Sequence, residues 1–254
     1  MALDNIFGAH QERIVSGLAM LAVVLTIGFI DDFFLTWLIL GGIYMLAFYE
    51  ASKLFDVNNN ANYAYAVIIW LVAGIYPYAD DLFVIAGVVF GAYTAFTQNR
   101  NLRLFLPFIY PTAGMLFTLS LYHEYGIMAL LWLLLVVAFT DIGAYVVGKS
   151  MGKTLFCETS PNKTLEGVVG GIVVATLSGL IVGLYYVDIS IALLISFLVA
   201  LSSIFGDLFE SYLKREAGVK DSGNVIPGHG GVLDRIDGYL FGSIIMLVML
   251  RGLV

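Results

Sequence analysis

The stretch from Asp207 to Asp237 concentrates side chains that could perform chemistry. Asp207, Ser211 and Lys214 are spaced i, i+4 and i+7, so a helix would place a carboxylate, a hydroxyl and an ammonium on one stripe. Charges beside apolar segments are costly and hard to explain as packing, so we expect a polar reaction site at a membrane surface. The stretch contains six acids, Asp207, Glu210, Glu216, Asp221, Asp234 and Asp237, and four bases, Lys214, Arg215, Lys220 and Arg235.

A glycine-rich turn, residues 227–231, precedes an apolar run that looks helical. Glycine lets backbone N–H groups approach a ligand closely. Free N–H groups and the dipole at a helix N-terminus both favour an anion. We therefore expect this turn to seat a phosphate group. Asp234 and Asp237 lie in the first turns of the following helix and can face the same site.

The charge balance of this region predicts a divalent metal. The six acids exceed the four bases, and the segment 141–166 adds three of each, so the site would repel an anionic substrate. Carboxylates with one nearby histidine and no cysteine suit Mg²⁺. Asp207 and Asp234, on adjacent helices, are the preferred ligands, and Asp221 and Asp237 are second choices. A second cation, monovalent or divalent, could share the site.

Three segments resemble the phosphatidate cytidylyltransferase family, also called CDP-diacylglycerol synthases. The long signature is carried by Ser211, Lys214-Arg215, Lys220-Asp221, Pro227 to Gly231 and Asp234 to Asp237. A second family element is matched by Ser160-Pro161-Asn162-Lys163-Thr164 and Glu166-Gly167 of this chain. Asn162 stands where the family usually has lysine. A third is carried by Asp141, Ala144-Tyr145 and Gly148. The resemblance covers roughly the C-terminal half of the chain.

The resemblance implies a reaction in which CTP and phosphatidic acid give CDP-diacylglycerol and pyrophosphate. Such transfers depend mainly on positioning and charge neutralisation. Basic side chains would clamp phosphates, arginine in bidentate fashion. The expected catalytic residues are Asp207, Ser211, Lys214, Arg215, Lys220, Asp221, His229, Asp234, Arg235 and Asp237. The expected substrate-binding residues are Asp141, Ser160, Lys163, Thr164, Glu166, Gly230 and Gly231.

The composition predicts an all-α, polytopic membrane protein. The 254 residues are 60% hydrophobic and 12% charged, and soluble domains carry about 25% charged residues. Lipid offers backbone groups no partner, so helices are expected. We expect one integral membrane domain, with N-terminal spans to about residue 122 and catalytic spans from about 125. Uncharged runs predict nine spans: about 14–30, 33–49, 63–78, 82–96, 104–122, 125–147, 167–187, 189–209 and 232–252. The third and fourth are short and could be a tilted hairpin or an incomplete crossing.

Loop charges predict the orientation in a cell (inner or plasma) membrane. Four connections lack Lys and Arg, and they contain Asp31-Asp32, Asp80-Asp81, His123-Glu124 and Asp188. The alternate connections are basic, and basic loops favour the cytoplasm. The 212–230 loop is therefore expected in the cytoplasm, with Arg13 on the same side and Arg251 as the one mild exception. With a net charge of −7, no nucleic acid partner is expected.

Small residues recur every fourth position along one predicted span: Gly167, Gly171, Ala175, Gly179 and Gly183. Such a ridge lets helices approach closely, either within the chain or in a homodimer.

The acids Glu210 and Glu216 are interpreted as solvated.

Transport is the main competing interpretation from another class. Multiple spans and the intramembrane acids Asp141 and Asp207 fit a transporter or channel. However, the charges gather at one loop and its helix ends, and neither an inverted repeat nor paired broken helices is apparent. Another membrane enzyme acting on phosphorylated lipids is the remaining alternative. Pyrophosphate release that requires both CTP and phosphatidate would separate these readings.

Overall fold

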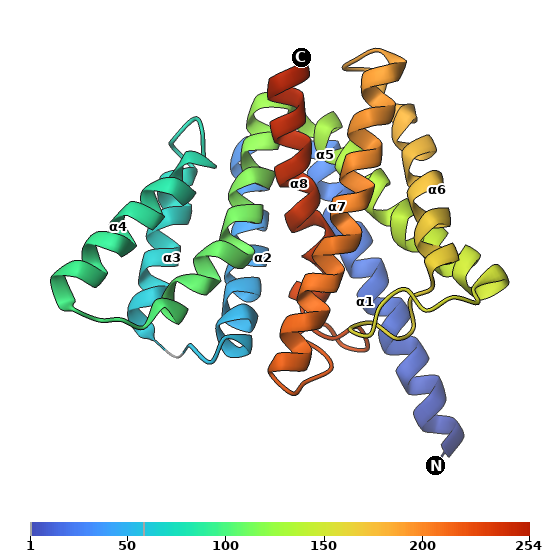
Figure 1. Ribbon diagram of the computed structural model, residues 1–254, viewed down its shortest axis with the longest axis horizontal. Coiled ribbons are helices and arrows are strands. Elements are labelled where there is room, and N and C mark those ends of the chain that lie inside the picture. Colours follow the sequence, from blue (N-terminus) through green and yellow to red (C-terminus); the bar gives the residue numbers. More distant parts are fainter. Residues whose placement is uncertain (1, 58) are drawn as a thin grey trace.

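The computed structural model describes residues 2–57 and 59–254, with side chains described from Ile14 onward. Arg13, which the sequence analysis placed on the cytoplasmic side, is not among the described side chains. Helices dominate the described part, and the only β-pairing there is two isolated bridges, which confirms the all-α class. The elements are α1 Ala2–Ile30, α2 Phe33–Leu54, α3 Asn60–Ala73, α4 Asp81–Thr97, η1 Leu102–Phe105, η2 Phe108–Thr112, α5 Ala113–Met151, α6 Leu165–Gly183, α7 Ile189–Glu216 and α8 Leu233–Leu253 (Figure 1).

Five helical segments of the described chain are long and apolar enough to cross a membrane: α2, the run Leu102–Met151, α6, α7 and α8. The apolar part of α1 and the helices α3 and α4 are shorter. At 1.5 Å per residue, the 14 residues of α3 reach only about 21 Å, less than the roughly 30 Å of a hydrocarbon core. The short third and fourth segments are therefore confirmed as short, and the count of nine crossings stays a prediction.

The helix α5 contains the end of the predicted span 104–122 and all of the predicted span 125–147. It is interrupted at Gly126, whose φ of 73° lies in the left-handed region that glycine tolerates. Tyr110, just ahead of α5, contacts Phe209 in the last part of α7, Ser120 bonds to Asp80 near the C-terminal end of the molecule, and Gly148 packs against Thr164 back at the opposite end. The chain therefore reverses direction at Gly126 without a separate loop.

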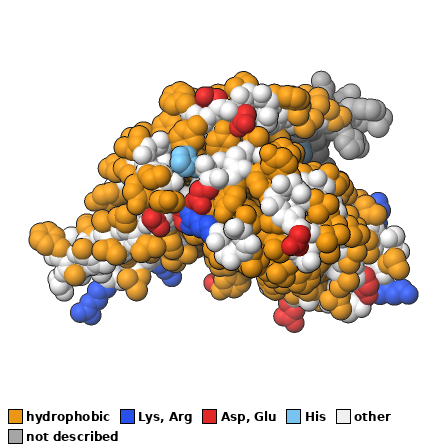
Figure 2. Space-filling view, turned by 90° about the horizontal axis from the view of Figure 1, so that it is seen from above, with side chains coloured by type: hydrophobic (Ala, Val, Ile, Leu, Met, Phe, Trp, Pro, Cys, Tyr) orange, Lys and Arg blue, Asp and Glu red, His pale blue; other side chains and the backbone are white. Residues whose placement is uncertain are grey.

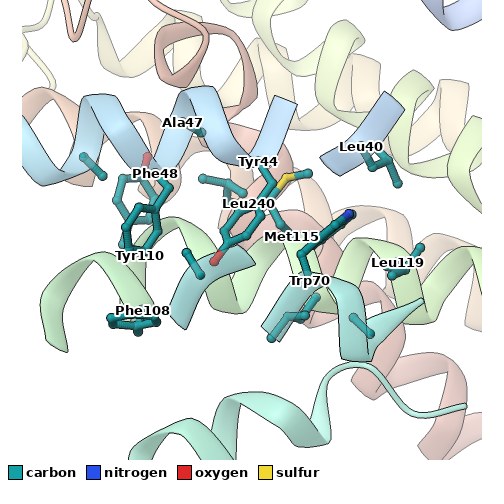
Figure 3. Close-up of a cluster of buried hydrophobic side chains, with 14 of the residues drawn as sticks. Leu40, Tyr44, Ala47, Phe48, Trp70, Phe108, Tyr110, Met115, Leu119 and Leu240 are labelled. Carbon is teal, nitrogen blue, oxygen red and sulfur yellow. The ribbon is translucent and has the colours of Figure 1, made fainter. Parts of the chain in front are cut away.

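Aromatic side chains join the N-terminal helices to the C-terminal half. The ring of Tyr44 lies 5.1 Å from Trp70 and 5.9 Å from Phe48, measured between centroids. Figure 3 shows these rings beside Tyr110, and Leu240 of α8 belongs to the same buried cluster. This cluster packs the N-terminal helices against α8, and a second buried cluster lies among α5, α6, α7 and α8.

The small-residue ridge of α6 packs inside the chain. A Cβ at Gly171 would lie 2.6 Å from the Thr140 carbonyl of α5, and one at Gly183 would lie 2.7 Å from Trp132. The close approach of α5 and α6 therefore requires these glycines. Of the two predicted uses, packing within the chain is the one observed.

The polar loops gather at one end of the bundle. Figure 1 shows the 152–164 loop, between α5 and α6, and the 217–232 loop, between α7 and α8, at the end opposite the C-terminus. At the C-terminal end, Arg251 bonds to Asp80 and Glu124, an arrangement that accounts for a basic residue among acidic connections. Figure 2, viewed from above Figure 1, shows charged side chains within a largely hydrophobic surface.

Candidate functional site

Three carboxylates from α7 and α8 meet near the loop end of the bundle. Oxygen atoms of Asp207, Glu210 and Asp237 all lie within 4.8 Å of one another. We call these residues the carboxylate cluster. Asp207 and Glu210 are one turn apart on α7, and close packing brings α8 alongside: a Cβ at Gly206 would lie 2.6 Å from the Asp237 carbonyl. Helix spacing and one tight glycine contact thus assemble the cluster.

Glu210 was interpreted as solvated, and this is wrong. Its side chain is 1% exposed, and its Oε2 accepts a 2.8 Å bond from Lys214. Its other oxygen, Oε1, is buried without a hydrogen-bond partner. The tight α7–α8 contact turns this face of α7 inward, which the sequence spacing alone does not reveal. The second acid interpreted as solvated, Glu216, is exposed as expected.

Two lysines lie against the cluster from different directions. Lys163, from the 152–164 loop, forms an ion pair with Asp207. Lys214 bridges Glu210 and Asp234, and its Nζ lies 2.6 Å from Oδ1 of Asp234. The site therefore brings together the signature on α7 and α8 and the second sequence element, as the sequence predicted for one reaction site.

Asp234 lies beside the carboxylate cluster and organises the loop. Its Oδ2 accepts bonds from the Ser222 amide at 2.9 Å, the Ser222 hydroxyl at 2.9 Å and the Gly231 amide at 2.7 Å. With Lys214 on Oδ1, both oxygens are already engaged. The structure thus places Asp237, rather than Asp234, with Asp207 in the group that could hold a metal.

The expected phosphate seat at the N-terminus of α8 is occupied by the protein itself. The amides of Val232 and Leu233 donate to the Glu50 carboxylate at 3.1 and 2.8 Å, and the Gly231 amide donates to Asp234. The N–H groups of Gly231, Val232 and Leu233 are therefore not free, contrary to expectation, and phosphate binding at this turn stays a prediction. A helix N-terminus attracts any nearby anion, and here two carboxylates of the chain fill that role.

A second polar region is a cavity of about 530 Å³ within the 217–232 loop. Arg235 crosses the turn and donates from Nε and Nη2 to the His229 carbonyl, at 3.2 and 2.9 Å. His229 Nδ1 lies 2.7 Å from the hydroxyl of Ser16 on α1. Backbone φ values of +74° at Gly228 and +86° at Gly230 shape the turn. The predicted residues that line the cavity are Lys220, Asp221, His229, Gly230 and Arg235.

The second sequence element builds the 152–164 loop that delivers Lys163. Thr164 caps α6 by accepting from the Gly167 amide. Glu166 accepts from the Lys153 and Thr154 amides and from the Thr154 hydroxyl. The Ser160 carbonyl accepts a turn bond from the Lys163 amide, and the side chain of Ser160 is half-buried.

The remaining predicted residues lie around these centres. Ser211 follows Asp207 by one turn of α7 and is half-buried. Arg215 is exposed and donates to the Val219 carbonyl. Asp141 is on an exposed face of α5, where the charges of Asp207 and Lys163 act on it.

Comparison with known proteins agrees with this geometry. The cytidylyltransferase family model matches residues 11–253. The phosphatidate cytidylyltransferase of Helicobacter pylori strain J99 is 42% identical over 95% of this chain and 92% of that protein. The chain belongs to the cytidylyltransferase family. It is therefore a nucleotidyltransferase enzyme, as the sequence predicted.

Other members of the family show how similarity is distributed. The phosphatidate cytidylyltransferase of Thermotoga maritima is 34% identical over 85% of this chain and 88% of that protein. The Bacillus subtilis protein of the same name is 48% identical, but over only 46% and 45% of the two chains. The long matches include the N-terminal half, for which sequence reasoning found no motif.

Sequence reasoning also missed contributions from that half. Glu50 on α2 bonds to the N-terminus of α8, and Ser16 on α1 bonds to His229. Tyr110 is 3% exposed, its hydroxyl has no hydrogen-bond partner, and the charges of Glu210 and Asp237 act on it. The available signal was a single acid, Glu50, directly after the predicted span 33–49, since acids within or beside spans are usually paired or functional.

Proposed function

We propose that this family member transfers CMP from CTP to phosphatidic acid, giving CDP-diacylglycerol and pyrophosphate, with Mg²⁺ at the carboxylate cluster. The observation that carries the proposal is the meeting of three carboxylates with two lysines in a chain of this family. Relatives that match most of the chain are named phosphatidate cytidylyltransferases.

The donor set fits a magnesium ion. Three carboxylates lie within reach of one another, and Oε1 of Glu210 is buried without a partner. Hard oxygen donors of this kind are what Mg²⁺ takes in proteins. A bound ion would neutralise phosphate oxygens as charge develops on them. We propose Asp207, Glu210 and Asp237 as the residues that hold it, and the possible second cation remains a prediction.

In the proposed reaction, an oxygen of the phosphatidate phosphate forms a bond to the α-phosphorus of CTP. The bond from that phosphorus to the bridging oxygen of the β-phosphate breaks, and pyrophosphate leaves with the electron pair. The attacking phosphate is already anionic, so no covalent enzyme intermediate is required. Lys163 and Lys214 supply positive charge beside the cluster. Lys220 and Arg235 supply it at the loop cavity, where we propose that the nucleotide binds.

We propose that the loop end faces the cytoplasm, where CTP is available, in the cell membrane. The support is the basic character of the connections at that end, together with the apolar helices. A homodimer also remains a prediction, although the α6 ridge gives it no support, because that ridge packs against α5. Light scattering of the purified protein measures the oligomeric state.

The test is pyrophosphate release by the purified full-length protein in detergent, with CTP, phosphatidate and Mg²⁺ each omitted in turn. We expect release only with all three. Replacement of the exposed Glu216 by alanine is a matched control that should behave like the unchanged protein. Release without phosphatidate, or none from folded protein, would overturn the proposal. Calorimetric titration of Mg²⁺ without substrates, lost in Asp207→Asn, tests the metal site independently of turnover.

A further inference from the structure

Glu50 is a buried carboxylate in an otherwise apolar stretch of α2. Its exposed fraction is 1%. The ion pairs recorded among the described residues do not include it. Burying a charge in a membrane protein is expensive unless strong donors compensate for the lost water. The position therefore calls for a specific set of donors.

Those donors come from the 217–232 loop and the first turn of α8. Glu50 Oε1 accepts from the Val232 amide at 3.1 Å, and Oε2 accepts from the Leu233 amide at 2.8 Å. The Ser222 hydroxyl lies 3.1 Å from Oε2. Amides at a helix N-terminus lack partners within the helix and carry the positive end of its dipole. The Glu50 carboxylate thus caps the N-terminus of α8 by accepting its amide hydrogen bonds, although it belongs to the distant helix α2.

The loop approaches Glu50 so closely that a side chain at either of two glycines would displace the carboxylate. A Cβ at Gly223 would lie 2.3 Å from Glu50 Oε1, and one at Gly231 would lie 2.5 Å from Oε2. Gly223 was not among the predicted site residues, and Gly231 was expected to contact substrate. Their contacts show that the loop backbone is fitted around this one carboxylate.

Close polar contacts lead from Glu50 to the carboxylate cluster. The one O–H of Ser222 is shared between Glu50 Oε2 at 3.1 Å and Asp234 Oδ2 at 2.9 Å, and Asp234 Oδ1 accepts from Lys214 at 2.6 Å. Lys214 in turn bonds to Glu210 at 2.8 Å. A displacement at Glu50 would therefore be transmitted both to the start of α8, which carries Asp237, and to the lysine at the cluster.

We propose that Glu50 is a positioning residue for nucleotidyl transfer. It holds the 217–232 loop and the first turn of α8 in one arrangement, so that the loop cavity and the carboxylate cluster face the same substrate. It acts through Ser222 and the α8 backbone and does not touch the reacting atoms. The catalytic part of this inference rests on the proposed function, whereas the tethering of the loop does not.

The test uses Glu50→Gln in the full-length protein. Glutamine keeps the side-chain size but presents an amide group to at least one donor that the carboxylate satisfied. We expect kcat/KM for CTP to fall about 10- to 100-fold, since a hydrogen bond to a charged group contributes about 1.5–3 kcal/mol. Hydrogen exchange at the Val232 and Leu233 amides should rise by a similar factor, while exchange in α6 stays unchanged.

The matched control is Ser52→Ala. Ser52 lies two residues from Glu50 on the same helix, is 1% exposed, and its hydroxyl has no partner. This variant should leave both readouts unchanged. If Glu50→Gln does not fold, Ser222→Ala removes only the link between Glu50 and Asp234 and should show the same paired changes to a smaller extent.

The two readouts separate the outcomes. Faster exchange at Val232 and Leu233 with unchanged kcat/KM would overturn the positioning role. Unchanged exchange would overturn the tether, whatever happens to activity. If the unchanged protein released no pyrophosphate, the proposed function would fail, while the exchange comparison would still decide whether Glu50 holds the loop.

Discussion

Two groups of charged side chains lie at opposite ends of the helix bundle, and each joins basic residues to carboxylates. At the C-terminal end, Arg251 binds Asp80 through Nη1 and Nη2 at 2.6 and 2.9 Å, and its Nε binds Glu124 at 3.0 Å. Each oxygen of Asp80 accepts at least one bond, including one from the Ser120 hydroxyl. This group is satisfied within the protein.

The group at the loop end is organised differently. The ion pairs recorded among the described residues give its four carboxylates, Asp207, Glu210, Asp234 and Asp237, two basic partners, Lys163 and Lys214. One oxygen of Glu210 and the hydroxyl of Tyr110 are buried without partners. Buried polar atoms are nearly always bonded, and a carboxylate oxygen left without a partner among three other acids is suited to receive a cation. The comparison teaches that a carboxylate oxygen without a partner, rather than the presence of charge, distinguishes the candidate site from the structural clamp.

The largest expected effect is on activity at the loop end. Asp237→Asn removes one charge from the cluster, and the loss of metal-assisted charge stabilisation is several kcal/mol. We expect pyrophosphate release to fall roughly a thousand-fold, with the unfolding temperature little changed. Turnover assays and thermal unfolding on the same preparation measure both. Activity above about a tenth of the original would contradict the role assigned to the cluster.

The next effect is on stability at the C-terminal end. Arg251→Met keeps the side-chain length but leaves Asp80, whose side chain is 6% exposed, without its cation. Breaking a buried pair costs about 3–5 kcal/mol, and partial exposure of Arg251 reduces this to roughly 2 kcal/mol. The free energy of unfolding should fall by that amount, with kcat/KM unchanged. Arg103→Met, at an exposed base, is the control and should change neither quantity.

The smallest effect concerns acid stability. Burial raises the pKa of Asp80, but the bonds from Arg251 and Ser120 outweigh it, so the pKa lies below its ordinary value of 3.8. A carboxylate with a lowered pKa contributes stability above the ordinary value, and this is lost as the pH falls through the lowered one. The difference in unfolding temperature between the unchanged protein and Arg251→Met should therefore shrink below about pH 4. A difference that stayed constant to pH 3 would count against the clamp.

The sequence predicted the helical class, because hydrophobic runs are a local property. The meeting of the second element with the signature was implied by the resemblance to the family. Prediction from the sequence failed where contacts between distant helices decide the outcome. The placement of Glu210 depends on the tight crossing of α7 and α8 at Gly206. The filling of the α8 N-terminus depends on Glu50, more than 180 residues earlier in the chain. No spacing rule within the signature could reveal either contact.

The reversal of the chain at Gly126 has a consequence for how the protein presents itself to its surroundings. Because α5 turns back without a loop, and α1 and α2 are joined only through Asp31 and Asp32, the connections of the described chain at the C-terminal end are short, and the longest is residues 74–80. The longer irregular segments, 152–164 and 217–232, are at the other end. A protease or an antibody added to sealed vesicles would therefore reach the longest loops from one side of the membrane. Cleavage or binding at these loops would show which end of the protein faces outward.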